Sequence, residues 1–417
     1  NKVEPELSFN YLGQIDGGGQ KGLFRYREGS TGSYTASQNR RPRILEINSQ
    51  VMDGRLNVHI GYSTHLHSKE TISSFSEKFI DTLKKIITHC CEEKHFGYTP
   101  SDFPLAKINQ EQLDEVFGDI PNIEDIYPLS PMQEGLLFQK LFHPKSNAYY
   151  IQTAFKIDGK LDSDRFKEAW GTLVKNFSIL RTGFKWDGLE SPLQFVLKNV
   201  KTDVIFEDWS QQKQPLAKLT QYMEALSEKH LNFGIPPLMG IHLIKSSSHC
   251  HYMIWNFHHI ILDGWCTPII IGELIKSYQK LKDNEDDIHI SSRPYKDYIN
   301  WLSKQDVKVS ETFWKEYLQG GKKTILSLSH FSKSKGGYGE TNYTLPKELS
   351  QKLIKVAKNC KITLSDVCQF AWGYLLSCYT NQDEVLFGIT VSGRSIDLAH
   401  IANMLGIFIN TLPQRIN

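Results

Sequence analysis

The chain lacks the features of nucleic-acid-binding and membrane proteins. Its 417 residues carry 48 Lys and Arg against 46 Asp and Glu, so there is no basic excess of the kind that binds nucleic acid. No apolar run approaches the roughly 20 residues that a membrane-spanning helix needs, and no signal peptide is visible at the N-terminus. We therefore expect a cytoplasmic protein that binds neither nucleic acid nor a membrane.

Cysteine is scarce and scattered. The seven cysteines are odd in number, and their spacing fits neither a disulfide framework nor a zinc site. Cys90 and Cys91 are adjacent but have no CxxC partner. The sequence therefore predicts reduced thiols and no bound metal.

The first 95 residues predict a small α/β unit. Segments 43–51 and 56–62 alternate apolar and polar residues around Asp53-Gly54, which is a strong hairpin signal. Apolar residues at helical spacing predict a helix over 68–89, and we interpret their stripe as core packing.

The remaining chain predicts a linker and a larger α/β region. Prolines punctuate residues 96–125, which we interpret as a linker with one short helix. An acidic stretch divides the region that follows into residues 126–290 and 291–417. Within the second part, the nearly continuous apolar run 385–391 predicts a fully buried strand. We interpret both ends of the chain as cuts through a longer polypeptide.

The most informative stretch is residues 258–265, His-His-Ile-Ile-Leu-Asp-Gly-Trp. An apolar run typical of a strand precedes it, and Thr267 with Pro268 predicts a helix start just after it. A loop between strand and helix presents a side chain rigidly. Histidine in such a place can act as a general base near neutral pH. His259 is our candidate for that role, because the adjacent His258 should point the other way on an extended segment.

Four further segments accompany this octapeptide. They are 127–138 (Tyr-Pro-Leu-Ser-Pro-Met-Gln-Glu-Gly-Leu-Leu-Phe), 180–184 (Leu-Arg-Thr-Gly-Phe), 295–301 (Tyr-Lys-Asp-Tyr and then Trp301) and 406–415 (Gly-Ile-Phe-Ile-Asn-Thr-Leu-Pro and then Arg415). Together with the octapeptide they resemble the ordered motifs of condensation domains in nonribosomal peptide synthetases. The wider superfamily that includes chloramphenicol acetyltransferase shares only the His-x-x-x-Asp-Gly core. Where the second motif of the family usually has Arg-His, this chain has Asn176-Phe177, so the resemblance assigns these two positions no role.

The N-terminal segment resembles a sister family. Residues 5–14, Pro-Glu-Leu-Ser-Phe-Asn-Tyr-Leu-Gly-Gln, are similar to the final motif of epimerization domains. By this resemblance, residues 1–95 are the C-terminal part of an epimerization domain. Residues 126–290 are then the N-terminal lobe of a condensation domain, and residues 291–417 are its truncated C-terminal lobe. The Ser-Pro-Met-Gln-Glu-Gly form of the first motif resembles condensation domains that accept a D-configured donor.

The resemblance implies a fold and a reaction. The fold is α/β, with two chloramphenicol-acetyltransferase-like lobes in a V, an incomplete C-terminal lobe and His259 in the tunnel between the lobes. The reaction is amide-bond formation between a carrier-bound peptidyl thioester and a carrier-bound aminoacyl acceptor. Upstream and downstream carrier domains would supply the phosphopantetheine arms, so the chain itself would bind no cofactor. Adenylation domains of the same synthetase are the other partners implied.

The resemblance also assigns supporting residues. Arg181 and Asp263 are expected to form a buried ion pair, so that both are structural. Gly264 would allow close backbone approach beside His259, and His258 would be structural. Three further residues either line the channel or serve packing and loop capping: Trp265, Tyr298 and Asn410.

Two alternatives remain at this stage. One is a coenzyme A-dependent acyltransferase, which the epimerization-like segment and the form of the first motif argue against. The other is a non-catalytic condensation-like domain that only docks partners. The presence of His259, Asp263 and Arg181 argues against that second alternative.

Overall fold

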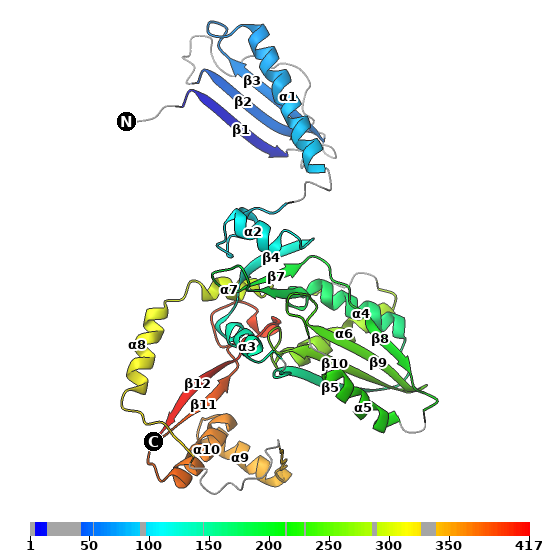
Figure 1. The fold of residues 1–417 in the computed structure, drawn as a ribbon, viewed down its shortest axis with the longest axis vertical. Helices are drawn as coiled ribbons and strands as arrows, with labels where there is room; N and C mark the ends of the chain where they lie inside the picture. The colour runs from blue at the N-terminus through cyan, green and yellow to red at the C-terminus, as the bar shows by residue number, and fades with distance from the viewer. Residues whose placement is uncertain are drawn as a thin grey trace. The chain divides into compact units, whose positions relative to one another are not determined.

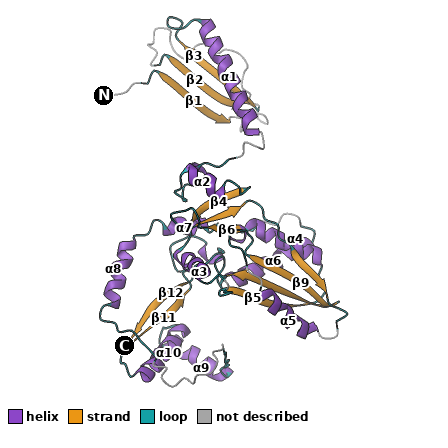
Figure 2. Cartoon of the chain, viewed as in Figure 1, coloured by secondary structure: helices purple, strands orange, loops and turns teal. Residues whose placement is uncertain are grey.

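The computed structural model separates into two compact units, residues 1–97 (unit 1) and residues 98–417 (unit 2). Both units contain helices and strands, so the α/β class is confirmed (Figures 1 and 2). The structure describes residues 5–14, 43–52, 54–91, 97–144, 146–212, 215–228, 231–285, 290–326 and 339–417.

Unit 1 is a three-stranded sheet with one helix. Strand β1 (Leu7–Gln14) runs parallel to β2 (Leu45–Met52), and β2 runs antiparallel to β3 (Arg55–Tyr62). The hairpin expected between the last two strands is confirmed, although Asp53 in its turn lies outside the described residues. Helix α1 (Lys69–Cys91) confirms the helix predicted over 68–89.

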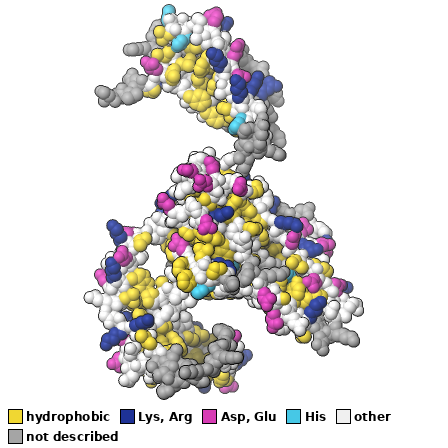
Figure 3. Space-filling view, in the orientation of Figure 1, with side chains coloured by type: hydrophobic (Ala, Val, Ile, Leu, Met, Phe, Trp, Pro, Cys, Tyr) yellow, Lys and Arg dark blue, Asp and Glu magenta, His cyan; other side chains and the backbone are white. Residues whose placement is uncertain are grey.

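The apolar side chains of unit 1 are only partly covered. No residue of α1 is fully buried, so the stripe that we interpreted as core packing is only partly covered. On β1, the alternating residues Leu7, Phe9 and Tyr11 are each more than half exposed. Figure 3 shows hydrophobic side chains gathered over this unit.

The central sheet of unit 2 has the strand order β5-β10-β9-β8 and is covered on both faces. On one face, Trp255 of β10 packs edge-on against Trp170 of α4, with ring centroids 6.2 Å apart. On the other face, the preceding residue Ile254 packs with Leu226 of α5, since successive strand residues point to opposite faces. The elements are β5 (Tyr150–Asp158), α4 (Ser163–Asn176), β8 (Val204–Asp208), α5 (Pro215–Ser227), β9 (Met239–Ser247), β10 (Cys250–His258) and α6 (Cys266–Lys282).

A second sheet, of order β4-β7-β6, includes part of the segment that we interpreted as a linker. Phe103 and Phe117 are buried against Ile126 and Phe195 in one hydrophobic cluster. Residues 98–125 therefore contribute to the core of unit 2, and the boundary between the units lies at Gly97. The prolines that suggested a linker lie in turns and short helices of this packed segment. Its elements are η2 (Pro100–Asp102), α2 (Gln110–Phe117), β4 (Ile123–Pro128), η3 (Ser178–Arg181), β6 (Thr182–Lys185) and β7 (Leu193–Leu197).

The C-terminal part of unit 2 contains four α-helices, one short 3-10 helix and a strand pair within its described residues. The prediction of a fully buried strand at 385–391 was right about the strand and wrong about its burial. Only Val385 of β11 is buried, because β11 pairs with β12 alone among the described strands. β12 itself was not predicted, since it contains Pro413. The elements are α7 (Lys296–Leu302), α8 (Val307–Leu318), α9 (Lys347–Asn359), α10 (Leu364–Thr380), β11 (Val385–Val391), η4 (Ile401–Asn403) and β12 (Asn410–Ile416).

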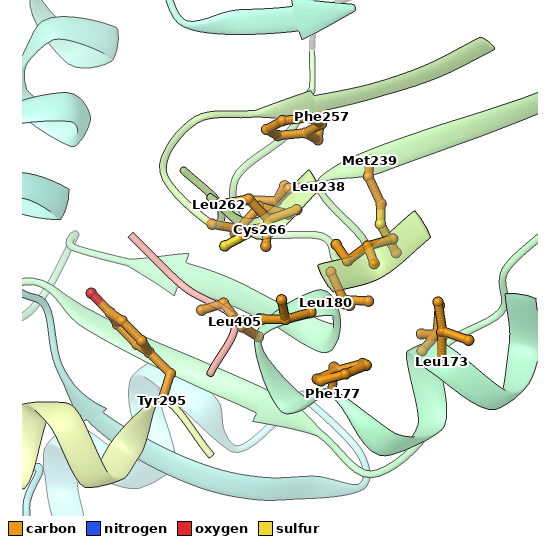
Figure 4. Packing of buried hydrophobic residues seen from close by; sticks show 14 of the residues in the cluster. Leu173, Phe177, Leu180, Leu238, Met239, Phe257, Leu262, Cys266, Tyr295 and Leu405 are labelled. Carbon is orange, nitrogen blue, oxygen red and sulfur yellow. The ribbon is translucent and has the colours of Figure 1, made fainter. Parts of the chain in front are cut away.

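The largest hydrophobic core holds the loop that follows β10. Ile260, Ile261 and Leu262 have no exposed surface, so the octapeptide is fixed in the core on its apolar side. Figure 4 shows Leu262 together with other members of this core, including Phe177. Phe177, one of the two residues that depart from the family's second motif, is therefore a core side chain.

Candidate functional site

The candidate site is the loop between β10 and α6. Helix α6 begins at Cys266, two residues before the predicted start at Pro268, and Thr267 is not its N-cap. The Asp263 side chain instead accepts a hydrogen bond from the Trp265 amide at 3.1 Å. Pro268 is tolerated inside the first turn, where backbone amides need no partner within the helix.

His258 is a buried, neutral histidine. Its Nδ1 accepts a hydrogen bond from the Ile260 amide at 3.1 Å. Burial, together with the nearby charges of Lys140 and His259, lowers the pKa of His258 to about 4. Because Nδ1 is an acceptor, the hydrogen of the neutral ring is on Nε2. This geometry agrees with the structural role that we expected for His258.

His259 is partly exposed and fixed by its backbone. Its amide donates to the Tyr149 carbonyl at 2.8 Å, which continues the pairing of β10 with β5. Its Nδ1 is buried and has no hydrogen-bond partner among the described residues. The other ring nitrogen, Nε2, is therefore the one through which His259 can exchange a proton with a ligand.

Asp263 binds the octapeptide to the C-terminal part of unit 2. One carboxylate oxygen accepts from the Phe408 amide at 3.0 Å, and the other lies 3.3 Å from Arg394 Nη2. Asp263 has no exposed surface, and the Arg394 side chain is 9% exposed. Arg394 also donates to the Ile401 and Met404 carbonyls at 2.7 and 2.9 Å. This network fixes residues 394–408 against the histidine loop.

The expected pairing of Arg181 with Asp263 is wrong. Arg181 is buried, but its Nη1 lies 2.5 Å from Glu124 and also donates to the Leu197 carbonyl. Its Nε donates to the Val174 carbonyl at 3.0 Å. The Arg181 guanidinium thus closes the end of α4 against β4 and β7, whereas the partner of Asp263 is Arg394.

Two glycines near the loop differ in what surrounds them. A Cβ at Gly264 would meet no atom within 4 Å, and this residue is exposed. A Cβ at Gly406, whose φ is +152°, would overlap the Tyr295 ring. Gly406 is therefore required by packing, whereas the space at Gly264 is open to a ligand.

Cys266 and Gln133 complete the anchoring of the loop. The Cys266 thiol donates to the Gly406 carbonyl at 3.1 Å, and burial raises the pKa of this thiol to about 12. Gln133 of α3 (Pro131–Phe142) donates to the Ile260 carbonyl at 3.1 Å, and it exchanges hydrogen bonds with Gln194. The helix of the first motif thus holds the histidine loop through a buried amide.

The three residues with open roles lie in different surroundings. Trp265 is 57% exposed, so it is not a core aromatic. Tyr298 packs against the rings of Tyr295 and Phe408, with centroids 5.4 and 4.8 Å away, and burial raises its pKa. Asn410 is exposed, and its side chain accepts from the Thr411 amide at 2.8 Å. A role in lining a channel stays a prediction for all three.

We searched the described residues for a cluster of metal-ligating side chains. Among them, no three His, Cys, Asp or Glu side chains lie together as metal ligands do. All seven cysteines are free thiols.

None of the helices in the described ranges is long and apolar enough to cross a membrane. Basic and acidic side chains are interspersed on the face drawn in Figure 3.

A groove of about 480 Å³ lies away from His259. Its walls include Val116 of α2, Trp186 after β6 and Asn232 before β9. None of the site residues predicted from the sequence lines it.

Sequence reasoning missed Arg394 and gave Gln133 no role. Arg394 follows a predicted strand as Ser-Gly-Arg, and a charged residue directly after an apolar run was the available signal. Gln133 lies within the first motif, where a buried amide has no signature of its own.

Comparison with known proteins shows which family the chain resembles. The family model of the condensation domain matches residues 1–108 and 123–417. One of the proteins that make up linear gramicidin synthase in Brevibacillus parabrevis is 35% identical over 424 residues, which cover 99% of this chain and 5% of that protein. Bacitracin synthase 3 of Bacillus licheniformis is 33% identical over 424 residues, which cover 100% of this chain and 7% of that protein. The chain thus spans a small fraction of the curated relatives that it matches.

Solved structures share the fold. The first condensation domain of the calcium-dependent antibiotic synthetase superposes with a TM-score of 0.59 at 18% identity, covering 70% of each chain. The starter condensation domain of rhizomide synthetase gives a TM-score of 0.58 at 20% identity, covering 70% of this chain and 66% of that one. The fold and the sequence match agree, and the chain belongs to the condensation-domain family.

Proposed function

We propose that this chain catalyses amide-bond formation in nonribosomal peptide synthesis. The amine of a carrier-bound aminoacyl thioester attacks the carbonyl carbon of an upstream carrier-bound thioester. The C–N bond forms, the C–S bond breaks, and the nitrogen loses a proton while the departing sulfur gains one. No cofactor in the chain is needed, because the thioester is already activated.

His259 is the residue that we propose for the reacting centre. The observation that carries this proposal is its geometry: a backbone amide bound to Tyr149, a buried Nδ1 and a partly exposed ring. Nε2 can orient the attacking amine or accept its proton. The open space at Gly264 leaves room for the reacting carbonyl beside the ring.

Asp263, His258 and Arg394 support the loop without touching the substrate. Asp263 joins it to Phe408 and Arg394, and His258 closes the turn through the Ile260 amide. Arg181 stabilises the fold through Glu124, away from this network. Trp265, half-exposed beside Gly264, is the aromatic residue that we propose for contact with an incoming arm.

We further propose a D-configured donor. Residues 5–14 resemble an epimerization-domain ending, and the family model matches residues 1–108 separately from residues 123–417. The form of the first motif also resembles that of condensation domains with D donors. On this proposal, unit 1 is the C-terminal part of the domain that supplies the donor. The partners are upstream and downstream carrier domains with phosphopantetheine arms, and adenylation domains, in the cytoplasm.

The test uses carrier domains loaded with defined substrates. A donor carrier bearing a D- or L-aminoacyl group is mixed with an acceptor carrier bearing an aminoacyl group, and the dipeptidyl acceptor is measured by intact-protein mass spectrometry. We expect product from the D donor and much less from the L donor. Equal rates with both donors would refute the D preference alone. Acylation of a free amine from acyl-coenzyme A, without product on the carriers, would show a coenzyme A-dependent enzyme instead.

A further inference from the structure

The segment before β5 holds both histidines of the octapeptide. The Tyr149 carbonyl accepts the His259 amide at 2.8 Å. Ala148 and His258 line the same small cavity. Ala148 and Tyr149, at the end of this segment, therefore lie against both histidines.

This segment contains an unfavourable backbone conformation. Tyr149 has a φ of +66°, in the left-handed region that non-glycine residues rarely adopt. Such a conformation persists only where surrounding contacts fix it. The position of the Tyr149 carbonyl, and with it the His259 amide, thus depends on what anchors residues 143–149.

Lys140 is the anchor from helix α3. Its ammonium group donates to the Pro144 carbonyl at 2.9 Å and to the Ser146 carbonyl at 3.2 Å. Lys140 also lines, together with Ser146, Ala148 and His258, a cavity of about 10 Å³. Other anchors come from the opposite side, where the Asn147 side chain donates to the Ser227 carbonyl at the end of α5.

We propose that Lys140 is a positioning residue, which sets the place of His258 and His259 by fixing residues 143–149 to helix α3. Three observations support this proposal. Lys140 donates to two backbone carbonyls of the segment, and it lines the same cavity as His258. The left-handed backbone conformation of Tyr149 also needs contacts that hold the segment in place. The alternative is that Lys140, near the C-terminus of α3, only caps that helix. The catalytic part of the proposal rests on the proposed function, whereas the positional part does not.

The positional part is tested by hydrogen exchange on the whole chain. Lys140→Met keeps an unbranched apolar side chain of nearly the same length and removes its donors, and Lys140→Arg restores them. We expect amide exchange in residues 257–263 to become about tenfold faster in Lys140→Met, the effect of losing roughly one hydrogen bond, and to return in Lys140→Arg. Lys276→Met is the matched control, because Lys276 is exposed on α6 and pairs with Glu273 on the same helix.

Exchange that accelerates only in the peptide of α3 would overturn the proposal in favour of helix capping. Unchanged exchange everywhere would overturn it as well. If Lys140→Met fails to fold, Lys140→Gln, which keeps an uncharged NH₂ donor group on a shorter side chain, replaces it and is expected to show a smaller acceleration in residues 257–263. No acceleration in folded Lys140→Gln would overturn the proposal.

The catalytic part is read from condensation kinetics with loaded carriers. Lys140→Met should lower kcat about tenfold with little change in KM, and Lys140→Arg should recover most of the loss. A rise in KM alone, or no recovery in Lys140→Arg, would contradict positioning of His259. If exchange behaves as expected but the unmodified chain forms no product, the proposed function fails and the positional role of Lys140 stands.

Discussion

Removing the Asp263 carboxylate should destabilise unit 2 strongly, because it leaves the Arg394 guanidinium buried without its counter-charge. Asp263 is fully buried, the Arg394 side chain is 9% exposed, and the carboxylate also accepts from two backbone amides. Breaking a buried pair by removing one partner costs about 3–5 kcal/mol. For a domain of this size, that corresponds to a fall in Tm on the order of 10 °C.

The assay is thermal or urea unfolding followed by tryptophan fluorescence. All eight tryptophans lie in unit 2, so the signal reports this unit. The double variant Asp263→Ala/Arg394→Met should be more stable than the sum of the two single losses predicts, by about 1–3 kcal/mol.

The pairing of Asp263 with Arg181, which the sequence suggested, provides the matched control. Losses from Asp263→Ala and Arg181→Met should add to within about 0.5 kcal/mol, since the two side chains share no partner among the described residues. Glu124→Ala should cost no more than about 1 kcal/mol, because Glu124 is 43% exposed and Arg181 keeps its carbonyl acceptors. Coupling of Asp263 to Arg181, with none to Arg394, would refute the network described here.

Two further predictions concern pH and space. The pKa of His258 in the folded chain is lowered to about 4 from 6.5, so the folded state disfavours the protonated ring. Protonation of His258 should therefore leave the free energy of unfolding unchanged above pH 6.5 and lower it by about 3 kcal/mol between pH 6.5 and pH 4. The pH profile of His258→Asn should lack this fall. The same fall in the unmodified chain and in His258→Asn would contradict the assignment to His258. Gly406→Ala should lower Tm by several degrees because of the Tyr295 ring, whereas Gly264→Ala should fold normally and lose condensation activity; full activity in folded Gly264→Ala would show that no ligand uses this space.

Much of the architecture followed from local pattern. The two hairpin strands expected at 43–51 and 56–62, and the helix expected over 68–89, begin and end within two residues of where alternation and helical periodicity predict. Segment 98–125 was misjudged because prolines punctuate it, although Phe103, Leu113 and Phe117 carry its packing. The burial of β11 was overestimated, since an apolar run shows what a strand could bury and not how many neighbours cover it.

The site was predicted in part. His259, His258 and Asp263 came from spacing and resemblance, and the geometry of their loop fits those roles. The partner of Asp263 could not be derived from the sequence, because it is 131 residues away and several arginines compete for the position. Lys140 had no signature at all, since it acts through backbone carbonyls that any sequence provides.

The most direct test of the central claim is single-turnover condensation with His259→Ala. Donor-loaded and acceptor-loaded carriers are mixed with each protein, and the dipeptidyl carrier is measured by mass spectrometry over time. His259→Ala should keep the Tm of the unmodified chain, because the His259 ring makes no hydrogen bond among the described residues through its buried Nδ1. Its rate of product formation should fall by about 100-fold or more, the usual contribution of a positioned acid–base group. A folded His259→Ala variant that forms dipeptide at the unmodified rate would contradict the account.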